Sequence, residues 1–227
     1  MPHLERDGEV YVLQLGDGEN RFNQDFVDAV TSLVQEVAAA PAPRALVTAA
    51  SGKIWSNGLD LEWMSEHVEA IEPLLDSVHA LYAELLGLGV STVAAIQGHA
   101  FAGGAMLALA HDIRVMRADR GWFCLPEVDI NIPFTHGMSA LITSRLPVPT
   151  AHEAMTTGRR YGGAEAVQAG IAVEAVSEEQ VLARAVAIAA AQAGKDPQTL
   201  QTIKRRMYAS TLAALADSAA NSISLPS

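Results

Sequence analysis

Apolar and polar residues follow two alternating patterns along the first part of the chain. The run EVYVLQL at residues 9–15 is β-rich and ends at Gly16 and Gly18, which predicts a strand followed by a turn. Asn23 is a suitable N-cap for a helix whose apolar residues recur every three or four positions until Pro41. Further strands are predicted at residues 45–48, 90–96, 112–116 and 122–124, and further helices at 59–64, 73–88 and 105–110.

The order of these elements predicts the fold class. Strands alternate with helices, which favours an α/β fold with parallel strand pairing and with ligands held in the loops after strand ends. From Phe134 onward the pattern is almost wholly helical. We therefore expect a core at residues 1–172 and a helical region at 173–227 that packs on the core or on a neighbouring subunit. The helices of this last third are expected at residues 138–146, 149–157, 163–169, 178–193 and 197–216.

Composition narrows the classes of protein. Half of the 227 residues are hydrophobic and 18% are charged, which indicates a large core rather than disorder. The 15 basic and 26 acidic residues give a net charge of −11, which argues against a nucleic-acid partner. The most apolar stretch, residues 101–110, is too short to span a membrane. A single cysteine, Cys124, and an amino-terminal sequence with acids where a signal would be apolar favour the cytoplasm.

Three segments carry the candidate chemistry. Residues 53–61 and 98–105 place glycines between a strand and a helix, where unpaired backbone N–H groups can bind negative charge; tight packing is the alternative. Residues 125–130 place Glu127 among apolar neighbours. Burial would raise the pKa of that carboxyl and make it a usable base, although a surface or helix-capping acid is the alternative.

Together, and in this order, the three segments resemble the crotonase superfamily, also called the enoyl-CoA hydratase/isomerase family. The resemblance covers about residues 9–172, and its most specific pieces are SNGLDL at 56–61, GHA and AGG at 98–104, and PEV at 126–128. It implies a spiral of ββα units with a helical trimerisation region, and hence a homotrimer or hexamer. It also implies an acyl-CoA thioester substrate.

The resemblance assigns roles to individual residues. It implies an oxyanion hole from the backbone N–H groups of Leu59 and Gly104, with Glu127 as an acid/base. The second glutamate of the family's hydratases would fall 20 residues earlier, where this chain has Leu107. A single carboxylate suits the transfer of a proton from C2 to C4. The local sequences are accordingly similar to the monofunctional Δ3,Δ2-enoyl-CoA isomerases, particularly the plant peroxisomal type.

The resemblance also suggests contacts with CoA, which is expected as part of the substrate, without any further cofactor. Arg21 would meet a CoA phosphate or be a solvated surface arginine, and the basic cluster at residues 204–206, Lys204, Arg205 and Arg206, would either face a phosphate or form a solvated helix face. The closing stretch, residues 216–227, is expected to be disordered. The residues that the resemblance places near CoA are Asn20, Arg21, Phe22, Ser56, Asn57 and Asp60.

Two other functions remain open from the sequence. A hydratase, hydrolase or decarboxylase would take a second polar group from His136 or Asp129, and a non-catalytic acyl-CoA-binding protein would keep the fold without the reaction. No metal site is expected, because the histidines lack metal-ligand spacing. Some large side chains suit either the core or an acyl pocket; these are Trp55, Trp63, Met138, Leu141 and Ile142.

Overall fold

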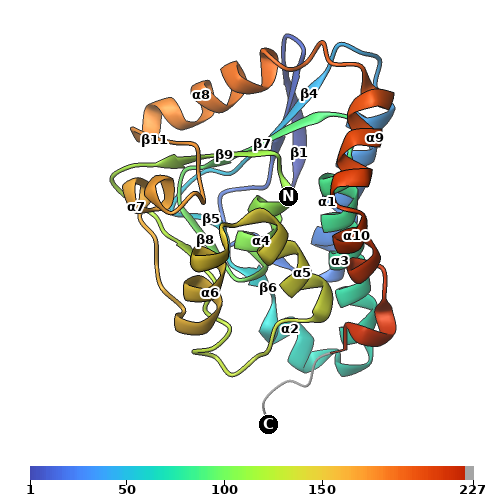
Figure 1. The fold of residues 1–227 in the computed structure, drawn as a ribbon, viewed down its shortest axis with the longest axis vertical. Helices are drawn as coiled ribbons and strands as arrows, with labels where there is room; N and C mark the ends of the chain where they lie inside the picture. Colours follow the sequence, from blue (N-terminus) through green and yellow to red (C-terminus); the bar gives the residue numbers. More distant parts are fainter. Residues whose placement is uncertain (223–227) are drawn as a thin grey trace.

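The computed structural model describes residues 1–222, and its central element is a six-stranded sheet (Figure 1). The strand order is β1-β2-β4-β7-β9-β11, and every pair is parallel except the antiparallel β1 and β2. The predicted strands and the parallel pairing are therefore confirmed. The strands are β1 His3–Asp7, β2 Val10–Gln14, β4 Ala45–Ala49, β7 Ser91–Ile96, β9 Ile113–Arg117 and β11 Glu174–Val176.

Very short strands follow the long ones and build a second layer. A three-stranded sheet has the order β10-β8-β5, and β3 pairs with β6. Each of β4, β7 and β9 thus continues into a short strand and then into a helix, which repeats a strand–strand–helix unit along the chain. The short strands are β3 Arg21–Phe22, β5 Ile54–Ser56, β6 Gly58–Leu59, β8 His99–Phe101 and β10 Phe123–Cys124.

The main sheet is covered on both faces because its strands alternate apolar side chains between them. Leu13 and Leu46 belong to the larger core with the helices of the first part of the chain, whereas Val12 and Val47 belong to a second core with α8. Figure 1 shows α8 above the sheet, apart from α1, α3, α9 and α10. The helices before residue 135 are α1 Gln24–Ala39, α2 Leu61–Glu66, α3 Ile71–Gly87 and α4 Gly103–Ala110, with the 3₁₀ turn η1 Val68–Ala70.

The sequence predicted the start of α1 and the nature of most helices, but not all bounds. Asn23 caps α1 by accepting a hydrogen bond from the N–H of Phe26 at 3.0 Å. Leu59, expected to begin a helix, lies in β6 instead, and α2 begins two residues later. The later helices are α5 His136–Arg145, α6 Val148–Thr157, α7 Gly163–Gln168, α8 Glu178–Ala190, α9 Pro197–Met207 and α10 Ala209–Leu215.

The expectation of a wholly helical last third is wrong at two places. Strand β11 pairs with β9 and extends the main sheet at its edge. The expected helix at 197–216 is interrupted at Tyr208, whose hydroxyl accepts a hydrogen bond from Arg145. The three residues of β11 are too few for a period-2 pattern to show.

The expectation of disorder from residue 216 is also wrong as far as residue 222. A 3₁₀ turn, η2 Ser218–Ala220, precedes Asn221, whose side-chain oxygen accepts from the N–H of Gly137 at 2.7 Å. Residues 223–227 lie outside the described part of the chain. Among the residues described, no helix is both long and apolar enough to cross a membrane.

Candidate active site

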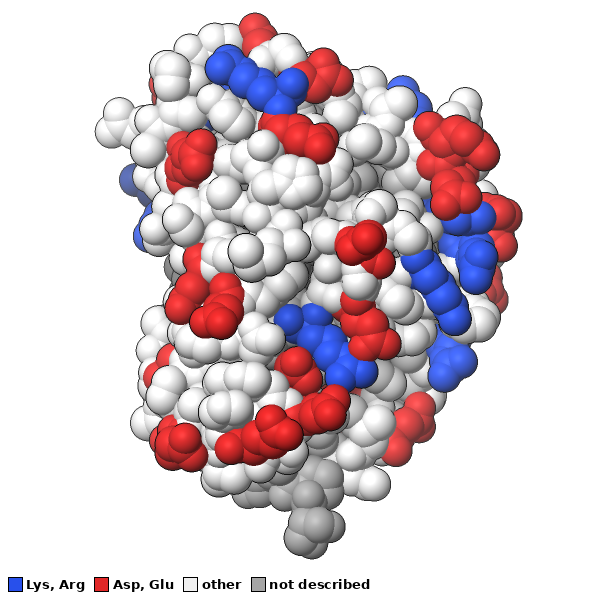
Figure 2. Space-filling model, turned by 180° about the vertical axis from the view of Figure 1, so that it is seen from behind, with Lys and Arg blue, Asp and Glu red and all other residues white. Residues whose placement is uncertain are grey.

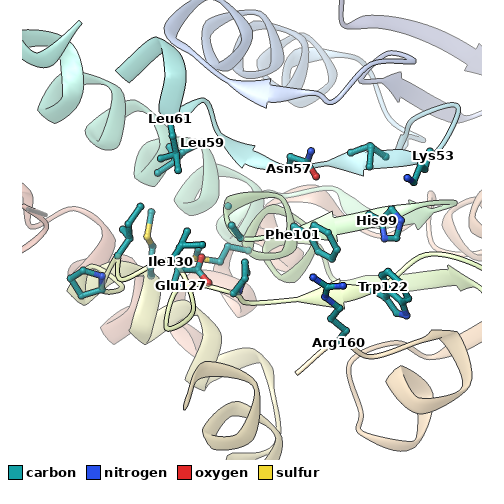
Figure 3. Close-up of a pocket in the computed structure, with 18 residues that line it drawn as sticks. Lys53, Asn57, Leu59, Leu61, His99, Phe101, Trp122, Glu127, Ile130 and Arg160 are labelled. Atoms are coloured by element: carbon teal, nitrogen blue, oxygen red, sulfur yellow. The ribbon is translucent and has the colours of Figure 1, made fainter. Parts of the chain in front are cut away.

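A cavity of about 400 Å³ lies where the short strands meet the start of α4 (Figure 3). Strands β5 and β8, the loop after β10 and the start of α5 contribute its walls. One part of the lining is apolar, and another combines aromatic and cationic side chains. The apolar residues are Ile54, Leu59, Leu61, Ala102, Met106, Pro126, Ile130, Ile132, Pro133 and Met138.

Glu127 points into this cavity from the turn that follows β10. The turn is held by hydrogen bonds from the N–H of Asp129 to the carbonyl of Pro126, at 2.9 Å, and from Ile132 to Glu127, at 3.1 Å. The side chain of Glu127 is buried, and its Oε2 atom has no hydrogen-bond partner. Burial raises the pKa of Glu127 to about 8, because the charged form is poorly solvated. The carboxyl can therefore both take and return a proton near neutral pH.

The start of α4 lies directly against β6. Gly58 has a φ of +75°, and a Cβ atom there would stand 2.5 Å from the nitrogen of Gly103. Only glycine permits this approach. The carbonyl of Gly103 accepts a hydrogen bond from the buried Tyr82 hydroxyl at 2.8 Å. On the other side, the N–H of Asp60 donates to Phe22 at 3.1 Å and joins the end of β6 to β3.

Gly103, not Gly104, faces the cavity together with Leu59. Gly103 lines the cavity, whereas a Cβ atom added to Gly104 would overlap the backbone and side chain of Ser56. The structure thus places Gly103, one position before the expected Gly104, at the cavity wall. Successive side chains of a helix point about 100° apart, so neighbouring residues of α4 face different surroundings.

The orientation of α4 also decides which residue stands where the family's hydratases have their second glutamate. Met106 lines the cavity from α4, whereas Leu107 is fully buried and is not among the lining residues. Counting back 20 residues from Glu127, as in the hydratases, gives Leu107, whereas the residue that lines the cavity is Met106. Both residues are apolar, so α4 brings no carboxylate to the cavity.

The structure places the residues expected near CoA in three different surroundings. Only Asn57 lines the cavity, and its buried Oδ1 atom has no partner. Phe22 is fully buried and stacks on Phe26 at 5.6 Å, and Ser56 is fully buried and donates to the carbonyl of Asn20 at 2.8 Å. In this structure both side chains lie in the core and neither lines the cavity.

The other three residues of that set border a separate surface depression. Asn20 donates from Nδ2 to the carbonyl of Trp55 at 2.9 Å. Arg21 pairs with Glu19 at 2.5 Å and lies 3.6 Å from Asp60 and 3.7 Å from Glu62. With three carboxylates around it, Arg21 is poorly placed to attract a phosphate.

The basic cluster at residues 204–206 is not a single exposed patch. Lys204 is buried and donates from Nζ to Asp112 at 2.6 Å and to the carbonyl of Val90 at 2.9 Å. It joins α9 to the main sheet. Arg205 and Arg206 are exposed whereas Lys204 is not, so the three side chains do not act together on one surface.

The other residues considered for the acyl pocket or for a second polar group lie in different surroundings. His136 is exposed at the start of α5 and does not line the cavity, whereas Met138 does. Trp55, Leu141 and Ile142 are core residues. No group of three metal-ligating side chains comes together in residues 1–222.

Sequence reasoning missed the cationic and aromatic part of the cavity. Lys53, His99, Phe101, Trp122 and Arg160 line it, and Figure 3 shows Lys53, His99, Trp122 and Arg160 gathered away from Glu127. His99 and Phe101 are alternate residues of β8 and face the same side. That period-2 pair was a possible signal, but a strand of three residues is too short to identify from it.

Comparisons with known proteins point to one family. The family model described as Enoyl-CoA hydratase/isomerase matches residues 5–225. Enoyl-CoA delta isomerase 2, peroxisomal, from Arabidopsis thaliana is 34% identical over 218 residues, which cover 90% of this chain and 91% of that protein. Carnitinyl-CoA dehydratase from Escherichia coli strain K12 is 31% identical over 89% of this chain and 78% of its own length.

Solved structures show the same architecture. Human mitochondrial delta3-delta2-enoyl-CoA isomerase superposes with a TM-score of 0.84 at 26% identity, over 94% of this chain and 85% of that one. An apo enoyl-CoA isomerase of Mycobacterium tuberculosis gives a TM-score of 0.88 at 25% identity, over 96% and 95% of the two chains. The expected crotonase-like fold is confirmed, and the chain belongs to the enoyl-CoA hydratase/isomerase family of enzymes.

Proposed function

We propose that the protein converts 3-enoyl-CoA thioesters into trans-2-enoyl-CoA thioesters. In this reaction the thioester oxygen accepts hydrogen bonds from the N–H groups of Leu59 and Gly103, and Glu127 moves one proton. The contact of Gly58 with Gly103 supports this pairing, because it brings β6 and the start of α4 to the same edge of the cavity. An oxyanion donor of this kind contributes about 3 to 4 kcal/mol to the transition state.

The chemistry needs one acid/base group. The Glu127 carboxylate takes a proton from C2, and the electrons of the C2–H bond form a dienolate whose negative charge lies on the thioester oxygen. Protonated Glu127 then returns the proton to C4, and the double bond moves from C3–C4 to C2–C3. Atoms and electrons balance without water, metal or redox partner, and CoA takes part only as a portion of the substrate.

One observation carries this proposal over hydration. Of the cavity-lining residues in the described part of the chain, Glu127 is the only carboxylate, and α4 presents Met106 beside it. A thioether does not activate water, whereas one carboxyl with a raised pKa suffices for a proton shuttle. The 34% identical Arabidopsis relative is named an enoyl-CoA delta isomerase, which supports the same reaction.

The test is the variant Glu127→Gln with a 3-enoyl-CoA substrate, followed by the ultraviolet absorbance of the conjugated product. We expect kcat to fall by about a hundred-fold to ten-thousand-fold, because the general acid/base is removed. Binding of the saturated acyl-CoA, measured by calorimetry, should change little. Wild-type turnover by the variant would refute the role of Glu127.

A second assay separates the alternatives. Wild-type protein incubated with crotonyl-CoA should leave its absorbance unchanged, and consumption of this conjugated thioester would favour a hydratase. Tight acyl-CoA binding without exchange of the C2 proton in deuterated water would favour a non-catalytic binding protein. A homotrimer or hexamer and a cytoplasmic location stay predictions.

A further inference from the structure

Two cations line one end of the cavity, away from Glu127, and a third lies in an adjoining depression, together with Asp119, which pairs with Arg117. Lys53 and Arg160 line the cavity there, and Arg120 borders an adjoining depression that shares Lys53, His99 and Trp122 with it. Within residues 1–222, none of the three cations forms an ion pair with a carboxylate. Figure 2 shows one face of the molecule, on which acidic side chains are spread widely and Lys and Arg form a few groups.

His99 lies at the centre of this end with an unsatisfied polar atom. Its side chain is only 6% exposed, and Nδ1 has no hydrogen-bond partner. The ring lies 5.1 Å from that of Phe101 and 5.0 Å from that of Trp122. The pKa of His99 is lowered by burial and then by Lys53, Arg120 and Arg160, so the imidazole is neutral where positive charge gathers.

Arg160 is held in a geometry suited to a planar anion. Its guanidinium carbon lies 5.2 Å from the centre of the Trp122 ring and 5.8 Å from that of Phe101. Stacking on aromatic faces leaves the N–H groups at the guanidinium edge free to donate to two oxygens of one group. A buried neutral imidazole adds a further donor without adding charge.

We infer that the cavity end formed by Lys53, His99 and Arg160, with Arg120 in the adjoining depression, binds an anionic group of the thioester substrate that is distinct from the thioester itself. The inference rests on the proposed function for the nature of the substrate. The group is a carboxylate or a phosphate, carried either by the far end of the acyl chain or by CoA. Arg21, the other cation considered for this task, is already neutralised by carboxylates.

The distance along β8 is compatible with one extended ligand. His99 and Gly103 are four positions apart along the chain, and such a segment spans at most about 14 Å even when fully extended. A thioester oxygen at the N–H of Gly103 and an anion at His99 therefore belong to one molecule of ordinary substrate size. Asn57, with its unpaired Oδ1, lines the same cavity and offers an acceptor to a ligand amide.

The test compares Lys53→Met and Arg160→Gln with wild type on three thioesters. The first is a neutral 3-enoyl-CoA, the second carries a carboxylate at the far end of the same acyl chain, and the third joins the neutral acyl group to N-acetylcysteamine, which lacks phosphate. Both side chains are exposed, so the substitutions should leave the fold intact, as circular dichroism can verify. Arg206→Gln, on the exposed face of α9, is the matched control for the loss of one positive charge.

Each source of the anion predicts a distinct pattern. If the acyl chain carries it, KM should rise about ten-fold or more for the second thioester alone; if CoA carries it, KM should rise similarly for both CoA thioesters and not for the third. KM values within two-fold of wild type for all three thioesters, or an equal rise for all three, would overturn the inference. If the wild type does not turn over these thioesters, dissociation constants measured by calorimetry give the same comparison, so failure of the proposed reaction is distinguished from failure of the anion site.

Discussion

The raised pKa of Glu127 predicts that this residue destabilises the folded protein as the pH rises. In the folded state its pKa is about 8, against an ordinary value of 4.5. Between these values the folded protein holds a proton that the unfolded chain has released. The free energy of unfolding therefore falls with rising pH, by about 1.4 kcal/mol per pH unit from this group.

The variant Glu127→Gln removes this dependence and keeps the size of the side chain. Relative to the variant, Glu127 should cost the wild type about 1 kcal/mol at pH 5 and about 4 kcal/mol at pH 8. Any constant effect of the amide is the same at both values of pH. We expect the inactive variant to become more stable than the wild type under alkaline conditions.

Urea denaturation at pH 5, 6.5 and 8 measures this difference directly. All other titrating groups are common to both proteins, so their contributions cancel in the comparison. A difference in unfolding free energy that stays constant across the three values, or that favours the wild type at pH 8, would refute the burial of an unpaired carboxyl. In the same range, kcat/KM for isomerisation should rise with pH and level off above about pH 8, because only the ionised Glu127 removes the C2 proton.

Three further predictions concern the neighbours of the cavity. Tyr82→Phe removes the hydrogen bond to the carbonyl of Gly103 and should lower kcat about ten-fold with little change in KM; a loss of stability with unchanged kcat would contradict a positioning role. Gly58→Ala should abolish activity, because its Cβ would stand 2.5 Å from the nitrogen of Gly103, whereas Gly18→Ala, with open space around it, is the control. Leu107→Ala should cost about 2 to 5 kcal/mol of unfolding free energy while turnover of the remaining folded protein stays near wild type, as denaturation and active-site-normalised assays can show.

Much of the fold followed from patterns within single segments. Asn23 and Pro41 mark the start and end of α1, since capping and helix breaking depend on neighbouring residues alone. The long buried strands showed as short apolar runs, and α3 showed its helical period. For Glu127, an apolar surrounding sequence indicated a raised pKa, which the burial of the side chain bears out.

The tertiary structure decided which residues of those segments meet. The choice of Gly103 and Met106 over Gly104 and Leu107 depends on the rotation of α4 about its axis, which is set by packing against β6 and Tyr82. Strands of two or three residues show no period, so β5 and β8, and with them the cationic end of the cavity, stayed invisible in the sequence.

The local sequence also did not show which polar side chains are buried. Ser56 and Lys204 look like ligand-binding or surface residues in the sequence, yet their partners, Asn20 and Asp112, lie 36 and 92 residues away. Local sequence determines which element forms and what chemistry it carries, because propensity and capping act over a few residues. Only the packed chain determines which side chain faces the substrate, because that orientation is enforced by contacts between segments that are remote along the chain.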